Sequence, residues 1–224
     1  MTPLEAMPIV RNAYLLAGPT ASGKSAIAAA LAREMGASIL SADSMLVYKG
    51  MDVGTAKPPP EEIAEFRMGG VDLVTPAEEF SAGAWLRAAA EWMKGIPPET
   101  PIVIVGGTGL YFSALLRGLD RAWTKPPPEY PVLKIDRAVV RRRIAERLDA
   151  MFVAGLEAEK RRLKALYPVW SKTASLAIGY REGDDREKIH WPRTKTPRLM
   201  PFQTPCSASS RLPMQRQTPA PARS

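Results

Sequence analysis

The sequence predicts an α/β fold, a doubly wound parallel sheet with helices on both faces, followed by a disordered C-terminal tail. Three observations predict this fold. Apolar strand candidates alternate with helical segments, a glycine-rich loop joins the first strand to the first helix, and one strand candidate is apolar at every position. A strand without polar alternation is typical of a parallel sheet that helices cover on both faces. A chain of 224 residues is long enough for one such domain with its own core.

The first half of the chain supplies most of the expected sheet. We expect a strand near 9–17, a helix near 24–35 ended by Gly36, and a second strand at 37–40. A polar cluster at 41–44 follows that second strand, and 71–74 is expected to form a further short strand.

The buried strand is expected later in this half. Ser81 is a suitable N-cap for a helix that runs to about Met93. The strand at 102–105 is the run Ile-Val-Ile-Val, and it is followed by the turn 106–108 and a helix at about 109–117.

The second half of the chain is predicted to form longer helices. A short strand is expected at 132–135, and a helix at 137–154 carries one apolar face, after which Gly155 interrupts a second helical stretch that runs to about 166. The apolar face consists of Val140, Ile144, Leu148 and Met151.

Two domain boundaries follow from composition. Residues 1–183 are predicted to form the α/β core, in which 120–131 is only a short proline-rich connector. Residues 184–224 are proline-rich, polar and without apolar periodicity, so this tail is predicted to be disordered.

Charge and cysteine content limit the possible partners and the cellular compartment of the protein. The chain carries a net charge of +8, of which the tail from 184 onward contributes +5, so the core is only mildly basic. Such a balance permits a nucleic-acid partner without requiring one. No apolar stretch approaches the roughly 20 residues of a membrane-spanning helix, and no signal pattern opens the chain. Cys206 is the single cysteine, so no disulfide framework is possible and a reducing cytoplasm fits. We also expect a monomer without a membrane association.

The glycine-rich loop has the pattern G-x-x-x-x-G-K-[ST] of a phosphate-binding loop, which makes the expected sheet P-loop NTPase-like. Its glycines let successive backbone N–H groups point at one anion, and the following helix directs its positive end to the same place. Lys24 adds a full charge, and the Ser25 hydroxyl can bind Mg²⁺. The loop residues are Gly18, Pro19, Thr20, Ala21, Ser22, Gly23, Lys24 and Ser25.

The strand ends distinguish this chain from an ordinary kinase or ATPase. Those enzymes place an acidic residue after a buried strand, whereas the strand at 102–105 is followed by Gly106, Gly107 and Thr108. The carboxylate at a strand end is Asp43, which can help hold Mg²⁺ through water, accept a proton from a nucleophile, or cap a turn with Ser44. Because the carboxyl ends of parallel strands share one edge, Asp43, Thr108 and the phosphate loop should converge.

Thr108 and the arginine-rich helix each have two interpretations. The Thr108 hydroxyl can point into the site or cap the next helix. Arg141, Arg142 and Arg143 can form a solvated face, but Arg143 and Arg147 are four residues apart and could share a side that faces phosphate.

Six segments together resemble the bacterial tRNA dimethylallyltransferase (tRNA isopentenyltransferase) family, in the family's order and spacing. They are GPTASGKS (18–25), SADSMLVYKGMDVGTAKP (41–58), VDLVTPAEEFSAGAW (71–85), IVIVGGTGLYFSALLRGLD (102–120), LKIDRAVVRRRIAERLDAMFVAGLEAEKRRL (133–163) and SLAIGYRE (175–182). The resemblance implies transfer of a dimethylallyl group from dimethylallyl diphosphate to N6 of the adenine on the 3′ side of the anticodon, in tRNAs that read codons beginning with U.

The resemblance also implies roles for individual residues. The phosphate loop would hold the diphosphate leaving group, with Lys24 and a Mg²⁺ on Ser25 stabilising its charge. Asp43 would be the general base, and Thr108 would contact the nucleotide near the reacting amine. Arg143 is the favoured diphosphate-side arginine, ahead of Arg137 and Arg147. The stretch that meets the flipped-out adenine of the tRNA anticodon stem-loop would be Asp43, Ser44, Met45 and Leu46.

The chain departs from the family pattern at two places that serve tRNA binding. The connector at 120–131 stands where the family inserts a helical domain that holds the anticodon stem-loop. After Glu182 the expected basic helix is replaced by the proline-rich tail, whose composition suggests an altered or frameshifted end. We therefore expect retained diphosphate binding and weakened tRNA binding. The alternatives are an adenylate (AMP or ADP) isopentenyltransferase and an impaired remnant that only binds phosphate or nucleotide, with a small-molecule kinase disfavoured.

Overall fold

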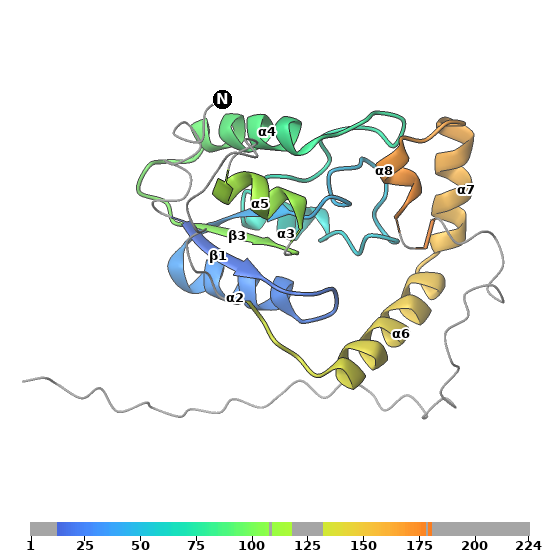
Figure 1. The fold of residues 1–224 in the computed structure, drawn as a ribbon, viewed down its shortest axis with the longest axis horizontal. Coiled ribbons are helices and arrows are strands. Elements are labelled where there is room, and N and C mark those ends of the chain that lie inside the picture. Colours follow the sequence, from blue (N-terminus) through green and yellow to red (C-terminus); the bar gives the residue numbers. More distant parts are fainter. Residues whose placement is uncertain (1–12, 108, 118–131, 178, 181–224) are drawn as a thin grey trace, which may run out of the picture. The chain divides into compact units, whose positions relative to one another are not determined.

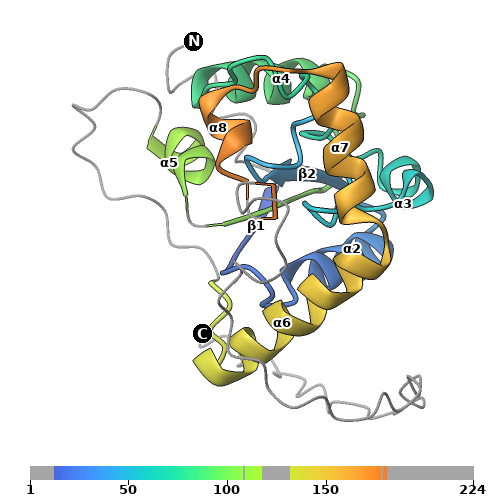
Figure 2. The same cartoon turned by 90° about the vertical axis from the view of Figure 1, so that its right-hand side faces the viewer.

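The computed structural model describes residues 13–107, 109–117, 132–177 and 179–180, which all fall within one unit, Met1–His190. The expected disordered tail at 184–224 and the connector at 120–131 lie outside the described residues. Figures 1 and 2 show this unit from two directions.

The described part of the sheet consists of three parallel strands in the order β1-β3-β2. They are β1 (Ala13–Ala17), β2 (Ser38–Ala42) and β3 (Ile102–Gly106). Ala17 and Ala42 both pair with Gly106, so all three strands end level at one edge of the sheet. The sequence predicts the site at this edge, where the carboxyl ends of the strands lie.

Helices cover both faces of the sheet, as predicted, and the central strand shows why its sequence is continuously apolar (Figure 1). Ile102 and Ile104 of β3 belong to the core shared with α4 (Ala82–Lys94) and α5 (Leu110–Arg117). Val103 and Val105 point the other way, into the core shared with α2 (Lys24–Met35).

Several helix boundaries follow the predicted signals. The Ser81 hydroxyl accepts a hydrogen bond from the Ala84 N–H (3.1 Å) and begins α4, and Gly36 ends α2 at a φ of 63°. Gly155, at a φ of 97°, separates α6 (Arg137–Val153) from α7 (Leu156–Leu166).

Two short helices were not predicted. Pro60, the last residue of a run of three prolines, begins α3 (Pro60–Glu65), because proline has no N–H to lose at the first helical position. The helix α8 (Lys172–Ser175) begins at Ser171, whose hydroxyl accepts from the Ala174 N–H.

Two predicted strands are wrong. The segment 71–74 forms only an isolated bridge between Tyr48 and Val74, because Asp72 has a φ of 50° that breaks an extended strand. At 132–135 only Val132 makes a bridge, to Ala17. The apolar face expected on α6 is also only half-buried, and no residue of that helix is fully buried.

Candidate phosphate-binding site

The loop 18–25 connects the end of β1 to the start of α2, and its glycines are required by the geometry. A Cβ on Gly18 would lie 2.9 Å from the Ser22 Oγ and 3.1 Å from the Leu133 Cβ. Gly23 has a φ of 90°, which residues with side chains rarely adopt. No side chain caps the N-terminus of α2, so its first N–H groups are directed at the loop.

The pKa of the Lys24 ammonium depends on its burial and on the charges of Asp43 and Arg147. Burial lowers the pKa of Lys24 from its ordinary value, the negative charge of Asp43 raises it, and the positive charge of Arg147 lowers it again. The Lys24 Nζ also lies 3.5 Å from the Pro19 carbonyl oxygen, which holds the ammonium over the loop. Because β1 and β2 end level at one edge of the sheet, the phosphate loop and the end of β2 converge, as the sequence predicted.

Asp43 forms the turn that follows β2. Its Oδ1 accepts a hydrogen bond from the Met45 N–H (2.8 Å), and its own N–H donates to the Ser41 Oγ (3.3 Å). The turn interpretation of Asp43 is therefore confirmed for Oδ1. Because the turn uses Oδ1, it does not prevent Oδ2 from accepting a proton or a metal-bound water.

The arginines of α6 approach the site at different depths. The Arg143 Nη1 donates to the Ala21 carbonyl (3.3 Å) in the phosphate loop, and its contact with diphosphate stays a prediction. Arg147 is half-buried, and burial lowers the pKa of its guanidinium while the Asp43 charge opposes that shift. Arg137 lines a separate apolar groove beside Pro19. The structure thus brings both Arg143 and Arg147 to the site, where the sequence favoured Arg143.

The other predicted site residues differ in their burial. Ser22 is buried, and its hydroxyl has no hydrogen-bond partner among the described residues. Ser25 is exposed in the first turn of α2, where its hydroxyl can reach a ligand on the loop. The half-buried side chains of the turn after β2 are Ser44, Met45 and Leu46. Thr108 lies outside the described residues.

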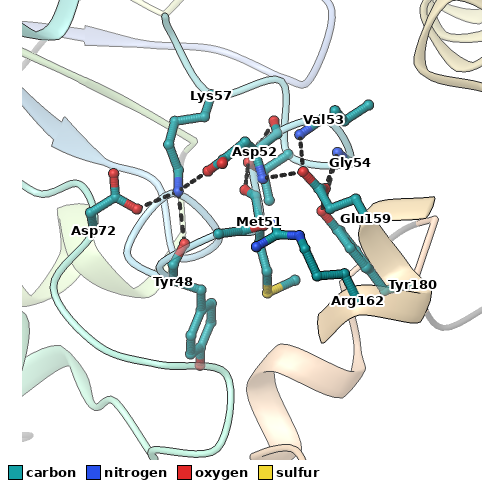
Figure 3. Close-up of polar contacts among 12 residues, drawn as sticks. Tyr48, Met51, Asp52, Val53, Gly54, Lys57, Asp72, Glu159, Arg162 and Tyr180 are labelled. Carbon is teal, nitrogen blue, oxygen red and sulfur yellow. Dashed lines mark hydrogen bonds and ion pairs between the residues drawn. The ribbon is translucent and has the colours of Figure 1, made fainter. Parts of the chain in front are cut away.

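A polar network that the sequence did not predict holds the loop 48–57 (Figure 3). Lys57 has a side chain only 3% exposed, and its Nζ donates to the Tyr48 carbonyl (2.8 Å) and to the carboxylates of Asp52 and Asp72. Glu159 of α7 accepts hydrogen bonds from backbone N–H groups at the other side of the loop.

A signal for this network was present in the chain. Lys57, Asp72 and Glu159 all lie inside segments that carry the family resemblance. Local patterns cannot pair Glu159 with a loop more than 100 positions earlier.

Among the described residues no cluster of three or more His, Cys, Asp or Glu side chains could hold a metal ion. None of the helices in the described ranges is long and apolar enough to cross a membrane.

Fold and site together define an α/β protein with a glycine-rich loop between β1 and α2, where Asp43 follows the neighbouring strand end and Arg143 donates to the loop. The family model described as IPP transferase matches residues 46–133 and 124–185, and the model described as isopentenyl transferase matches residues 11–68. The chain belongs to the IPP transferase family.

Individual relatives agree with this assignment. The tRNA dimethylallyltransferase of Rhodopseudomonas palustris (strain BisB18) is 37% identical over 203 residues, which cover 88% of this chain and 61% of the relative. That of Phenylobacterium zucineum is 53% identical over 107 residues, or 47% of this chain and 35% of the relative. The chain thus spans between about a third and three-fifths of the length of these relatives.

Solved structures show the same fold. The tRNA delta(2)-isopentenylpyrophosphate transferase of Staphylococcus epidermidis has a TM-score of 0.64 and 26% identity, covering 76% of this chain and 78% of that chain. The tRNA isopentenylpyrophosphate transferase of Bacillus halodurans also has a TM-score of 0.64, with 25% identity, covering 76% of this chain and 75% of that chain.

Proposed function

We propose that this chain transfers a dimethylallyl group from dimethylallyl diphosphate to N6 of the adenine on the 3′ side of the anticodon in tRNA. The observation that carries the proposal is that the phosphate loop after β1 and Asp43 after β2 lie at one edge of the sheet, where the Arg143 Nη1 donates to the Ala21 carbonyl of the loop (3.3 Å). Cations suit a departing diphosphate, and a carboxylate suits a proton that must leave the attacking amine.

The proposed step is a displacement at the allylic carbon. The lone pair of N6 forms the new bond to C1 of the dimethylallyl group, while the C1–O bond breaks and its electron pair leaves with the diphosphate. Lys24, Arg143 and the N–H groups at the start of α2 stabilise the negative charge that accumulates on this leaving group. The proton of N6 passes to Asp43, whose Oδ2 is outside the turn.

We propose that a Mg²⁺ ion binds this site together with substrate. The Ser25 hydroxyl is exposed beside the loop, the described residues offer no cluster of three metal ligands, and Mg²⁺ commonly combines few protein ligands with phosphate oxygens. Bound there, Mg²⁺ would neutralise diphosphate charge. Ser25 would hold it, and Asp43 could assist through water.

We propose that the turn after β2 contacts the acceptor adenine. Ser44, Met45 and Leu46 are half-buried beside Asp43, so they can contact a base that has been extruded from its stack. Thr108 is proposed to contact the same nucleotide. We further propose that the protein acts in the cytoplasm as a monomer.

An adenylate acceptor is the second candidate, and one observation favours it. Only residues 118–136 connect α5 to α6, which leaves no room for a helical domain that holds an anticodon stem-loop. AMP needs no such domain, whereas tRNA affinity should fall without it.

One acceptor comparison tests both candidates. The full chain is incubated with labelled dimethylallyl diphosphate and Mg²⁺, and tRNA, an anticodon stem-loop or AMP is offered in parallel. We expect label in tRNA, with weaker tRNA retention on filters than a full-length relative shows. Label in AMP alone would overturn the tRNA proposal, and no label in any acceptor would favour a remnant that only binds phosphate.

A further inference from the structure

Glu159 is an almost buried carboxylate that collects backbone N–H groups from one loop. Its side chain belongs to α7, and the residue is 8% exposed. Its Oε2 accepts from the N–H groups of Asp52 (3.1 Å) and Val53 (2.9 Å), and its Oε1 accepts from that of Gly54 (3.2 Å). Three consecutive N–H groups on one carboxylate form a concave anion-binding turn whose anion is supplied by the protein itself (Figure 3).

Tyr180 completes this arrangement. Its hydroxyl donates to the Glu159 Oε1 and accepts from the Gly54 N–H (3.1 Å). The ring packs so closely that a Cβ on Gly54 would lie 2.3 Å from its Cε2. Burial and the neighbouring Glu159 raise the pKa of Tyr180, so the hydroxyl keeps the proton that it donates.

The loop held in this way leads directly to the phosphate site. Thr55 follows the three N–H groups, its hydroxyl donates to the Met51 carbonyl (2.6 Å), and its own carbonyl accepts from the Arg147 Nη2 (2.8 Å). Arg147 lies one helical turn after Arg143, whose Nη1 donates to the Ala21 carbonyl of the phosphate loop (3.3 Å). Hydrogen bonds thus join Glu159, the loop 52–55 and Arg147, and α6 brings Arg147 beside the phosphate loop.

We infer that Glu159 is a positioning residue: it fixes the loop 52–55 so that the Thr55 carbonyl orients the Arg147 guanidinium toward a diphosphate on the phosphate loop. This inference rests on the proposed function, because it requires a diphosphate on the phosphate loop and adds Arg147 to the groups that bind it. Glu159 contacts the loop backbone, and its effect on the ligand passes through Arg147.

The substitution Glu159→Gln tests the inference with little change in volume. The amide NH₂ cannot accept, so at the Oε2 position it would face two N–H donors. The side chain is therefore expected to place NH₂ at the Oε1 position, where it meets the Gly54 N–H. This leaves the loop weakly held while α7 stays intact.

Affinity for inorganic diphosphate in the presence of Mg²⁺, measured by calorimetry on the full chain, gives the readout. We expect Glu159→Gln to weaken binding at least about fivefold, and to weaken it less than about twofold when Arg147→Ala is already present. Hydrogen exchange at 52–54 should also accelerate in Glu159→Gln. If Glu159→Gln does not fold, Tyr180→Phe replaces it, with an expected weakening of about threefold that likewise disappears beside Arg147→Ala.

Ser171→Ala is the matched control. It removes a buried hydroxyl that bonds the Tyr48 hydroxyl (3.3 Å) and caps α8, without a contact to 52–55. We expect its diphosphate affinity to stay within about twofold of wild type. Unchanged affinity in Glu159→Gln, or equal losses with and without Arg147, would overturn the positioning role alone. A wild-type protein that binds no diphosphate would overturn the proposed function as well.

Discussion

Removal of the Lys57 ammonium should destabilise the protein, and Lys57→Met is the cleanest change because it keeps the length of the side chain. Lys57 donates to the Tyr48 carbonyl at 2.8 Å and to the Asp52 carboxylate at 2.7 Å, with Asp72 as a third partner. Each hydrogen bond to a charged group contributes about 1.5–3 kcal/mol when it is buried.

The full sum is not expected, because water can replace part of the network. The side chains of Asp52 and Asp72 are 54% and 42% exposed, so both carboxylates can be solvated once the ammonium is gone. Water cannot reach the Tyr48 carbonyl in the same way, because Tyr48 is fully buried. We therefore expect a loss of about 2–3 kcal/mol in the free energy of unfolding.

Urea unfolding followed by tryptophan fluorescence measures this loss at constant m-value. Lys94→Met is the control, because Lys94 and its partner Glu91 are 73% and 74% exposed and should change stability by less than about 0.5 kcal/mol. A loss below about 1 kcal/mol for Lys57→Met would refute the reasoning that this network holds the loop 48–57.

Two further predictions concern the site and its support. Burial lowers the pKa of Lys24, so the folded chain binds this proton less well than the unfolded chain. The resulting cost to stability is fully present below the folded pKa and is relieved as pH rises toward the ordinary value of 10.5. Lys24→Met should therefore raise the melting temperature at neutral pH while it abolishes diphosphate binding, and a lowered melting temperature with intact binding would contradict this. Gly54→Ala should lower the unfolding free energy by at least about 2 kcal/mol, because its Cβ would lie 2.3 Å from the Tyr180 ring, whereas Gly95→Ala meets only an ordinary contact at 3.4 Å. Equal urea midpoints for the two alanine variants would show that the Tyr180 ring can yield.

The sequence predicted the parts of the fold that local patterns determine. The apolar run at Ile102–Gly106 became the central strand, and the glycines of the phosphate loop became its sharp turn. Asp43 and the loop converge because parallel strands that pair in register end at one edge.

Other features depend on contacts that no local pattern encodes. The segment at 71–74 has the residues of a strand, but its backbone pairs with the loop at 46–47 and Asp72 adopts a left-handed φ of 50°. Glu159 resembles any exposed acid of an amphipathic helix until the loop 52–54 folds against it. Arg143 and Arg147 lie four residues apart on one helix, so spacing did not distinguish their roles. Their different burial in the structure does.

The central claim is that Asp43 and the phosphate loop together form a site for prenyl transfer, and Asp43→Asn tests it most directly. The asparagine amide can still accept from the Met45 N–H, so the turn should survive while the base is lost. Single-turnover transfer from labelled dimethylallyl diphosphate to tRNA or AMP is measured beside the affinity for that diphosphate. We predict a rate loss of about a hundredfold or more with affinity retained. Transfer at the wild-type rate in Asp43→Asn would contradict the account.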